Sequence, residues 1–333
     1  CIKEGIKYLT TKQLVSKCLA FTNKATIQLN GTTIHKFMTI DKDGKLNQKW
    51  AKEQSRNIDV IFVDEISMIS SELWMVLAEF KYYTGITFIL IGDFRQLPPV
   101  NDSELLFYEK EDWFNHPTIK SLANYNRCEL TITHRYDQEL AKILDDIWEN
   151  NGNNSQSFLS KITERTIKEL VESKNITYCN ITRKRINREV QNHLIKDIID
   201  FIEIPYKGEE NKYNQDIILF KGAKLIMYLT TKCKTFKKNE EVNVVKFDDT
   251  TITITNGTKT ETFKYMGNKS KNNFHKMFLL GYATTIHKSQ GDTIRGIVNI
   301  FDINMIQDWL KDRRALYTAL SRATNLKCIK ISR

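Results

Sequence analysis

The chain has 333 residues, of which 41% are hydrophobic and 27% charged, a balance that excludes a disordered chain and is typical of folded globular proteins. Its length allows two domains of ordinary size, each with its own core. The formal net charge of +10 suits a polyanionic partner such as a nucleic acid, although many basic proteins bind none.

Targeting and redox features favour an intracellular protein. No apolar run approaches the roughly 20 residues that a bilayer crossing requires, and no signal-peptide pattern is present, so we expect no membrane partner. The six cysteines are scattered without a CxxC pair, which favours a reducing compartment, nucleus or cytoplasm, over a disulfide framework or zinc site. Abundant Lys, Asn and Ile hint at a virus or a protist. The first residue is Cys rather than Met, so we expect the native chain to begin upstream.

The first part of the chain predicts a parallel sheet of the α/β class. Apolar segments at residues 16–22, 59–65 and 87–93 predict buried strands. Each ends in polar residues, at the edge where a parallel sheet presents its ligand groups. A helix should begin at Ser70 and Ser71. Its expected apolar face consists of Leu73, Val76, Leu77 and Phe80.

In the second part, the sequence pattern changes twice, from α/β to alternating apolar and polar residues and back to α/β. We expect a polar loop at residues 150–157, a strand at 176–180 and a basic helix from 182 to about 199. Residues 215–275 then alternate apolar and polar side chains, and the Asn256-Gly257 dipeptide predicts a hairpin with a two-residue turn. This segment indicates a small antiparallel barrel inserted into a second α/β domain. The α/β pattern resumes afterwards, with strands expected at 296–302 and 326–331.

Two adjacent acids end the second predicted strand. Asp64 and Glu65 follow the apolar run at residues 59–63. A nucleotide hydrolase needs one carboxylate to hold hydrated Mg²⁺ and another to orient and deprotonate the attacking water. A solvated strand end or a helix cap is the alternative interpretation of this pair.

A polar, proline-stiffened segment, GDFRQLPPV, follows the third predicted strand at residues 92–100. Asp93 and Gln96 lie just past the strand, where the Gln96 amide can hydrogen-bond a γ-phosphate. The alternative is a stiff turn with incidental polar residues.

The strings DEISM and GDFRQLPPV closely resemble motifs II and III of superfamily 1 helicases, in the RecD, Dda and petite-integration-frequency branch. Further strings follow in family order from about residue 16 to 325: AFTNKAT at 20–26 resembles motif Ia, and GTTIHKF at 31–37 the segment after it. LTITHR at 130–135 resembles the motif IV region, GYATTIHKSQGDT at 281–293 motif V, and ALYTALSRAT at 315–324 motif VI.

This resemblance implies an ATP-dependent DNA helicase with two RecA-like P-loop NTPase domains and the cofactors ATP and Mg²⁺. Asp64 would hold the metal ion, and Glu65 and Gln96 would act in hydrolysis. Arg135 and Arg322 would stabilise charge in the transition state. Each arginine taken alone would instead suit a surface salt bridge. Three further residues are expected near the nucleotide: Asp93, Gly291 and Asp292.

The same resemblance implies a single-stranded DNA partner, held mainly through its phosphates. The expected contacts are small, polar or cationic: Thr22, Asn23, Thr33, His35, Thr285, His287, Lys288, Ser289 and Gln290. Either histidine alone would more often be a packed or capping residue. The basic run at residues 183–185 would touch phosphate or form a solvated helix face.

The 333 residues contain no GxxxxGK[ST] phosphate-binding loop. The Gly44-Lys45 pair is followed by Leu46 and does not match. We therefore expect the loop to lie upstream of Cys1, with residues 1–13 as the tail of the helix after it, and we expect this chain by itself to lack ATPase activity. Residues 38–58, where relatives carry a strand-separating pin, are short and polar.

The predicted organisation is a first RecA-like domain at residues 1–122 and a second at 123–333, the latter carrying an SH3-like β insertion at 215–275. Resemblance implies 5′→3′ movement by a monomer on single-stranded DNA, in replication, repair or recombination. An RNA helicase of the same superfamily and a non-catalytic single-strand-binding module are the alternatives.

Overall fold

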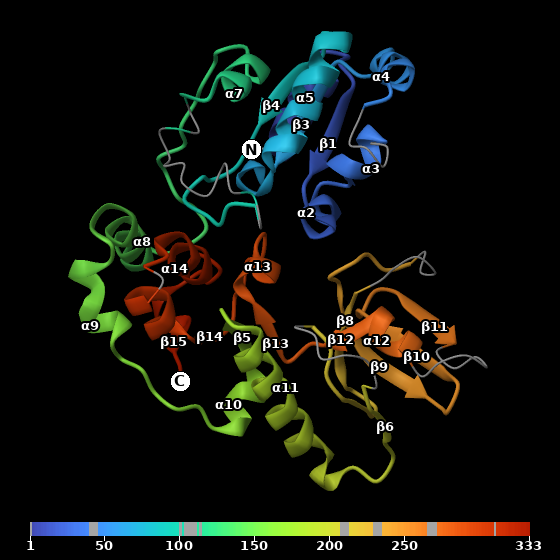
Figure 1. Cartoon of the computed structure of the whole chain (residues 1–333), viewed down its shortest axis with the longest axis vertical. Helices are drawn as coiled ribbons and strands as arrows, with labels where there is room; N and C mark the ends of the chain where they lie inside the picture. The colour runs from blue at the N-terminus through green and yellow to red at the C-terminus, as the bar shows by residue number, and fades with distance from the viewer. Residues whose placement is uncertain are drawn as a thin grey trace. The chain divides into compact units, whose positions relative to one another are not determined.

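The computed structural model describes residues 2–39, 46–99, 102, 112, 115–206, 213–228, 235–264, 272–309 and 311–333. The chain divides into two compact units, Cys1–Ile132 and Thr133–Arg333 (Figure 1). The boundary predicted after residue 122 lies before this division. The Gly44-Lys45 pair and Val100, the last residue of the GDFRQLPPV string, lie outside the described residues.

Unit 1 is built on a parallel sheet of four strands in the order β2-β1-β3-β4. The strands are β1 (Ser16–Ala20), β2 (Thr32–Thr33), β3 (Val60–Asp64) and β4 (Thr87–Leu90). The three predicted strands are confirmed. Each observed strand ends within two residues of the last apolar residue of its predicted segment, which is Phe21, Val63 or Ile91. The helices are α1 (Ile2–Thr11), α2 (Asn23–Gln28), α3 (Ile34–Met38), α4 (Gln48–Ser55), η1 (Ile66–Met68), α5 (Ser71–Thr84) and α7 (Pro117–Leu122).

The two faces of this sheet pack against different helices, because successive side chains of a strand point to opposite faces. Cys18, Val60 and Phe62 form one buried cluster with Ile2 of α1. Leu19, Ile61 and Val63 belong to the larger cluster that contains the apolar face of α5. The helix predicted within residues 1–13 is therefore present as α1 (Ile2–Thr11), and it covers one face of the sheet.

Helix α5 forms as its sequence predicts. The Ser70 hydroxyl caps it by accepting a hydrogen bond from the Leu73 amide at 3.4 Å. Gly85 ends it in the left-handed conformation, φ 69°, which glycine adopts without steric cost. The four predicted apolar residues are all buried: Leu73, Val76, Leu77 and Phe80.

Unit 2 contains a second parallel sheet of four strands, in the order β13-β5-β14-β15. These are β5 (Lys174–Thr177), β13 (Ala283–Thr285), β14 (Val298–Ile300) and β15 (Ile329–Ile331). Its helices are α8 (Gln138–Asn150), α9 (Gln156–Leu159), α10 (Ile167–Glu172), α11 (Asn180–Leu194), α13 (Ile286–Ser289) and α14 (Arg313–Leu320). Short turns are η2 (Asn153–Ser155), η3 (Ile195–Asp197), the π-helical η4 (Met305–Trp309) and η5 (Leu326–Cys328).

The predicted loop at 150–157 is partly wrong. It contains η2 and the first residues of α9, because Asn151 and Gly152 end α8 in left-handed conformations and the chain turns at once into a new helical segment. The predicted strand at 176–180 also ends early, since Cys179 already caps α11.

An antiparallel sheet interrupts unit 2, as the change of texture predicted. Its strand order is β11-β10-β9-β8-β12. The strands are β8 (Lys224–Met227), β9 (Glu241–Phe247), β10 (Thr251–Thr255), β11 (Thr260–Lys264) and β12 (Phe278–Leu280), the last preceded by α12 (Asn272–Met277). A separate antiparallel pair, β6 (Ile202–Ile204) and β7 (Ile217–Leu219), precedes it.

The β10–β11 hairpin is confirmed, but its turn is longer than predicted. Strand pairing stops at Thr255 and Thr260, so residues 256–259 form the connection. The Asn256 carboxamide oxygen accepts hydrogen bonds from the amides of Thr258 and Lys259, which replaces ladder bonds at this end. Gly257 supplies the positive φ of 90°.

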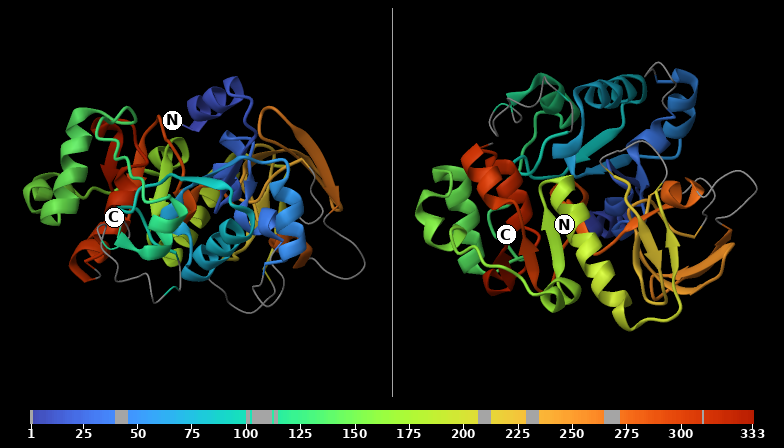
Figure 2. Two further views of the ribbon diagram at one scale, coloured as in Figure 1. Left: turned by 90° about the horizontal axis from the view of Figure 1, so that it is seen from above. Right: turned by 60° about the horizontal axis from the view of Figure 1, so that its bottom comes forward.

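Helix α11 joins the insertion to the α/β sheet of unit 2, and it lies beside the insertion in each view (Figures 1 and 2). Ile186 and Val190 of α11 belong to the same buried cluster as the strands of the insertion. The buried Asn187 side chain accepts a hydrogen bond from the Ala283 amide of β13 at 2.9 Å. Gln191 accepts one from the Ile218 amide of β7 at 2.7 Å. One helix thus satisfies backbone donors of the α/β sheet and of the separate β6–β7 pair.

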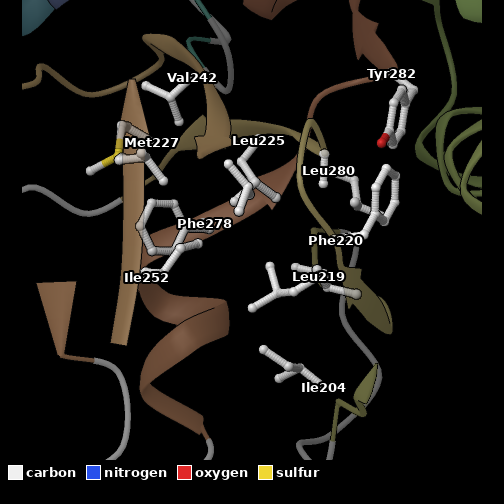
Figure 3. Packing of buried hydrophobic residues seen from close by; sticks show 14 of the residues in the cluster. Ile204, Leu219, Phe220, Leu225, Met227, Val242, Ile252, Phe278, Leu280 and Tyr282 are labelled. Carbon is white, nitrogen blue, oxygen red and sulfur yellow. The ribbon is translucent and has the colours of Figure 1, made fainter. Parts of the chain in front are cut away.

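The core of the insertion is apolar and close-packed. Figure 3 shows Phe278 beside Met227 and Ile252, and Leu280 beside Tyr282. Tyr282 is 4% exposed, and its hydroxyl oxygen accepts a hydrogen bond from the Lys224 amide at 3.3 Å. Burial raises the pKa of Tyr282 to about 12, so the phenol stays protonated. In the described part of the chain, no helix has the length and apolarity that a membrane crossing requires.

Candidate functional site

The carboxyl ends of three neighbouring strands bring several predicted residues of unit 1 together. Ala20 of β1 pairs with Thr33 of β2 on one side and with Asp64 of β3 on the other. Thr22 and Asn23 follow two and three residues after Ala20. These predicted residues therefore share the edge at which parallel α/β sheets bind their ligands.

The two adjacent acids at this edge have different backbone conformations. Asp64 is the last residue of β3 and is half-buried. Glu65 is left-handed, with φ 55° and ψ 48°, and η1 begins after it. The predicted strand through Glu65 is thus one residue too long, because the chain turns at the second acid. A non-glycine residue costs about 1–2 kcal/mol in this conformation, and such residues concentrate at functional sites.

Gly92 holds this turn against the end of β4. A Cβ atom at residue 92 would lie 2.8 Å from both the nitrogen and Cγ1 of Ile66. The Ile66 amide donates to the Ile91 carbonyl at 3.2 Å, and the Ile91 amide donates to the Val63 carbonyl at 2.8 Å. Only a residue without a side chain permits this approach, so Gly92 positions the backbone of Glu65.

Asp93 is bonded by Arg95, a residue that the sequence interpretation did not single out, and by the backbone of Gln96. The Arg95 guanidinium donates two hydrogen bonds to the Asp93 carboxylate, at 3.0 and 3.2 Å. The Arg95 and Gln96 amides bond the Asp93 carboxylate and carbonyl, at 3.0 and 3.1 Å respectively. Gln96 is 8% exposed. The bidentate geometry makes Asp93 a support for this loop, and its predicted nucleotide contact stays a prediction.

Two of the nucleic-acid candidates in unit 1, Thr22 and Thr33, also hydrogen-bond the first turns of helices. The Thr22 hydroxyl accepts a hydrogen bond from the Ala25 amide at 3.2 Å, next to Asn23, the first residue of α2. The Thr33 hydroxyl caps α3 at the Lys36 amide, at 3.4 Å. His35 is exposed, and its ring contacts that of Phe21 edge-on, with centroids 5.8 Å apart. His35 therefore has a face available to a ligand as well as a packing partner.

In unit 2, hydrogen bonds connect the chain segments that carry the two predicted catalytic arginines. Arg135 is exposed, two residues before Asp137, the cap of α8. The Asp137 amide donates to the Thr324 carbonyl at 3.2 Å, and its carboxylate accepts from the Leu326 amide at 3.3 Å. Thr324 follows Arg322 by two residues, so the two arginines come from neighbouring segments.

Arg322 is fully buried and bonds oxygen atoms of its own unit. Its guanidinium donates to the Thr318 carbonyl at 2.9 Å, the Ser321 hydroxyl at 2.9 Å and the Asp292 carbonyl at 3.4 Å. Gly291, beside Asp292, has φ 85°, which favours glycine. Arg322, Gly291 and Asp292 are therefore brought together as predicted. The catalytic role of Arg322 stays a prediction.

The predicted residues from Thr285 to Gln290 differ in exposure. Thr285 caps α13 from a buried position, and the Ser289 hydroxyl donates to the Ile286 carbonyl at 2.8 Å within the helix. Gln290 is 2% exposed. His287 and Lys288 are half-buried. These two residues remain the best placed of the set for contact with a nucleic acid, whereas Ser289 is engaged in the structure of its own helix.

Three residues around Lys288 were not singled out from the sequence, namely Tyr213, Tyr228 and Lys238, and a fourth, Arg183, was considered only as part of the basic run at 183–185. Tyr213 and Tyr228 place their rings 5.1 and 5.5 Å from its ammonium nitrogen. Arg183 is 2% exposed, so it does not belong to the solvated face predicted for residues 183–185. Burial lowers the pKa of Lys288 to about 8, and the charges of Arg183 and Lys238 add to that effect. Only the apolar spacing of α11 could have revealed that Arg183 points inward.

The carboxylate at the end of β3 is a suitable ligand for the Mg²⁺ ion of a magnesium–nucleotide site. Mg²⁺ in such sites takes one or two carboxylates and completes its coordination with phosphate oxygens and water. Asp64, at a strand end, supplies such a carboxylate. Among the described residues, no cluster of three or more His, Cys, Asp or Glu side chains forms a self-contained metal site. The glycine-rich loop that would cradle the phosphates does not occur in this sequence.

Comparisons with known proteins match both units. The family described as an AAA domain matches residues 1–102, and the family described as a UvrD-like helicase C-terminal domain matches residues 280–326. The first range contains the acids and Gln96. The second contains the predicted motif V and VI residues from Thr285 to Arg322.

Similar curated proteins include two bacterial helicases and a viral protein. The ATP-dependent DNA helicase Pif1 of Campylobacter jejuni is 25% identical over 98% of this chain and 84% of its own length. The Pif1 of Bdellovibrio bacteriovorus is 24% identical over 98% and 79%. The uncharacterized protein R530 of Acanthamoeba polyphaga mimivirus is 24% identical over 83% and 75%.

Solved structures with the same fold include Pif1 helicases from a bacterium and a yeast. The Bacteroides protein, in complex with ADP-AlF3 and single-stranded DNA, has a TM-score of 0.65 at 20% identity, over 95% of this chain and 82% of its own. The Candida albicans protein has a TM-score of 0.66 at 18% identity, over 99% and 87%. These matches confirm the predicted fold class of two RecA-like α/β domains.

Proposed function

We propose that this chain, whose matches support the Pif1-like superfamily 1 DNA helicases, is an ATP-dependent motor that moves 5′→3′ on single-stranded DNA. One observation carries the proposal. The motif II and III residues adjoin the carboxyl edge of the unit 1 sheet, and hydrogen bonds join the motif IV, V and VI segments of unit 2. In an unrelated α/β protein, these motif segments would not be expected to lie together.

Each unit contributes its own groups to the proposed reaction. Asp64 holds Mg²⁺, and Glu65 accepts the proton of the attacking water. Gln96 hydrogen-bonds the γ-phosphate, and Arg135 and Arg322 stabilise the negative charge that develops during transfer. Magnesium-bound ATP, when present, supplies the phosphoanhydride bond whose hydrolysis drives movement.

Residues at or near the N-terminal ends of helices would bind the DNA. Thr22, Asn23, Thr33 and His35 serve unit 1, and the Thr285 to Gln290 segment serves unit 2. Backbone amides and side chains of this kind bind phosphates without reading bases. We expect a monomer inside the cell, acting in replication, repair or recombination. The mimivirus relative supports a viral or protist source.

Two measurements test this function. Fluorescence anisotropy with labelled oligo(dT), RNA and duplex of equal length should show preferred binding of single-stranded DNA, with a salt slope of about −0.7 per phosphate neutralised. Strand displacement with 5′- and 3′-tailed substrates should proceed only from the 5′ tail, in a chain that carries a phosphate-binding loop. Preference for RNA would favour the RNA helicase alternative.

A second function is favoured by one specific observation. The absence of GxxxxGK[ST] from these 333 residues removes the main phosphate contacts from the nucleotide site, so residues 1–333 on their own act as a single-strand-binding module. Phosphate release with and without single-stranded DNA distinguishes the two. DNA-dependent hydrolysis by residues 1–333 alone would refute the module.

A further inference from the structure

Lys288 contacts two tyrosine rings that come from the segments just before β7 and just after β8. Tyr213 precedes β7, and Tyr228 follows β8. Their ring centroids are 5.8 Å apart at an interplanar angle of 38°, and the Lys288 ammonium lies 5.1 and 5.5 Å from them. These distances are within the range of cation–π contacts, which fix an otherwise flexible ammonium group.

A second ammonium group approaches the same aromatic pair. Lys238 lies 5.2 Å from the centroid of Tyr228. The Arg183 guanidinium is held close by, because it donates a 2.8 Å hydrogen bond to the carbonyl of Tyr213 and a 3.1 Å bond to the side chain of Asn180. Two ammonium groups therefore contact the aromatic pair, and a guanidinium bonds the backbone of one of its residues.

Positive charge at this place is not compensated by carboxylates bonded to the two lysines. Within the described ranges, neither Lys288 nor Lys238 forms a salt bridge. The effect is seen in the pKa of Lys288, which burial lowers to about 8 with further contributions from Arg183 and Lys238. A bound anion would relieve this repulsion, since opposite charge favours the protonated lysine.

We propose that Tyr213, Tyr228 and Lys238 complete with Lys288 a binding site for the backbone phosphates of a DNA single strand. Lys288 and Lys238 contact the phosphates, and the tyrosine rings position the two ammonium groups. The insertion thereby becomes part of the DNA-binding surface of unit 2. This inference rests on the proposed function, because that function supplies the single strand.

The test compares two lysines of the insertion that have different surroundings. Lys238→Ala should weaken oligo(dT) binding by about fivefold and reduce the salt slope by about 0.7, the loss of one phosphate contact. Lys246→Ala removes the same charge from an exposed position on β9 and is the matched control. Equal affinities and slopes for the two variants would overturn the inference.

The tyrosine is tested as a positioning residue. Tyr228→Leu should weaken binding by about two- to tenfold without a change in formal charge, and Tyr228→Phe should restore it because the ring face is kept. Failure of phenylalanine to restore binding, in a chain with wild-type circular dichroism, would contradict the cation–π role. If the Tyr228 ring had only a structural role, Lys238→Ala would not weaken oligo(dT) binding.

The experiment separates this inference from the function on which it rests. If the wild-type chain does not bind oligo(dT), the proposed function fails. If the wild type binds and the Lys238 and Tyr228 variants bind equally well, only the inference fails. Selective competition by inorganic phosphate at matched ionic strength, dependent on Lys238, would indicate a site for free phosphate and would also overturn it.

Discussion

Gly92→Ala tests whether the turn at Glu65 depends on close approach of the neighbouring strand. An ideal Cβ at residue 92 would lie 2.8 Å from both the nitrogen and Cγ1 of Ile66. Non-bonded heavy atoms favour separations of about 3.5–4.0 Å. The Ile66 backbone must therefore move by roughly half an ångström or more, and Glu65 must move with it.

The expected cost follows from the rigidity of this region. Overpacking a well-packed interior costs about 1–3 kcal/mol. The Ile66 amide also donates to the Ile91 carbonyl at 3.2 Å, and lengthening that bond adds to the loss. A cost of about 2 kcal/mol corresponds to a roughly 30-fold larger population of locally opened molecules.

Amide hydrogen exchange of β3 is the suitable assay, because it reports opening of unit 1 without assuming that both units unfold together. The amides of Ile61 and Val63 should exchange roughly 30-fold faster in Gly92→Ala. Gly296→Ala is the control, since a Cβ there meets no heavy atom within 4 Å. Exchange at the wild-type rate in Gly92→Ala would refute the packing argument.

Three further perturbations have defined outcomes. The folded-state pKa of Lys288, about 8, lies below its ordinary value of 10.5, so stability should rise as pH increases from 8 to 10.5, while DNA affinity should fall by up to about tenfold between pH 7 and 9. Lys288→Arg should flatten the affinity profile, and an unchanged profile would exclude Lys288 from DNA contact. Asp302→Ala should destabilise unit 2 by about 1–3 kcal/mol in urea unfolding, because the carboxylate accepts hydrogen bonds from Tyr178, Cys179 and Thr182. Asp302→Asn keeps one acceptor and tolerates the φ of 65°, so equal losses would contradict this reasoning. Glu65→Gln, in a chain with a phosphate-binding loop, should keep ATP and DNA binding and lose phosphate release; turnover within about threefold of wild type would exclude Glu65 as the base.

Local patterns predicted the regular elements well. The apolar run of β3, the capping serine of α5 and the alternation of β10 and β11 are each determined by residues close in sequence. The turn at Glu65 was not predictable in this way. It depends on Gly92, which lies two residues beyond the end of β4 and matters because it has no side chain.

In the candidate site, too, residues that belong to local sequence motifs were predictable, whereas residues brought together only by the fold were not. Asp64 and Arg322 were singled out by strings of adjacent residues; the structure places Asp64 at the end of β3 and Arg322 against the carbonyl of Asp292. The surroundings of Lys288 were not predictable, because Tyr213, Tyr228 and Lys238 come from separate segments without a shared motif. The burial of Arg183 likewise follows from packing across α11 and not from its basic neighbours.

The hydrogen bonds made by α11 constrain how this chain could have evolved. Asn187 and Gln191 satisfy amides of β13 and β7, and Ile186 and Val190 share one core with the inserted strands. Deletion of the whole insertion would leave the buried carboxamide of Gln191 without the Ile218 amide that donates to it. It would also remove the apolar side chains that pack against α11. Removal or transplantation of the insertion should therefore require compensating changes on α11, at Ile186, Val190 and Gln191. Insertions and deletions should be tolerated at surface turns such as residues 256–259.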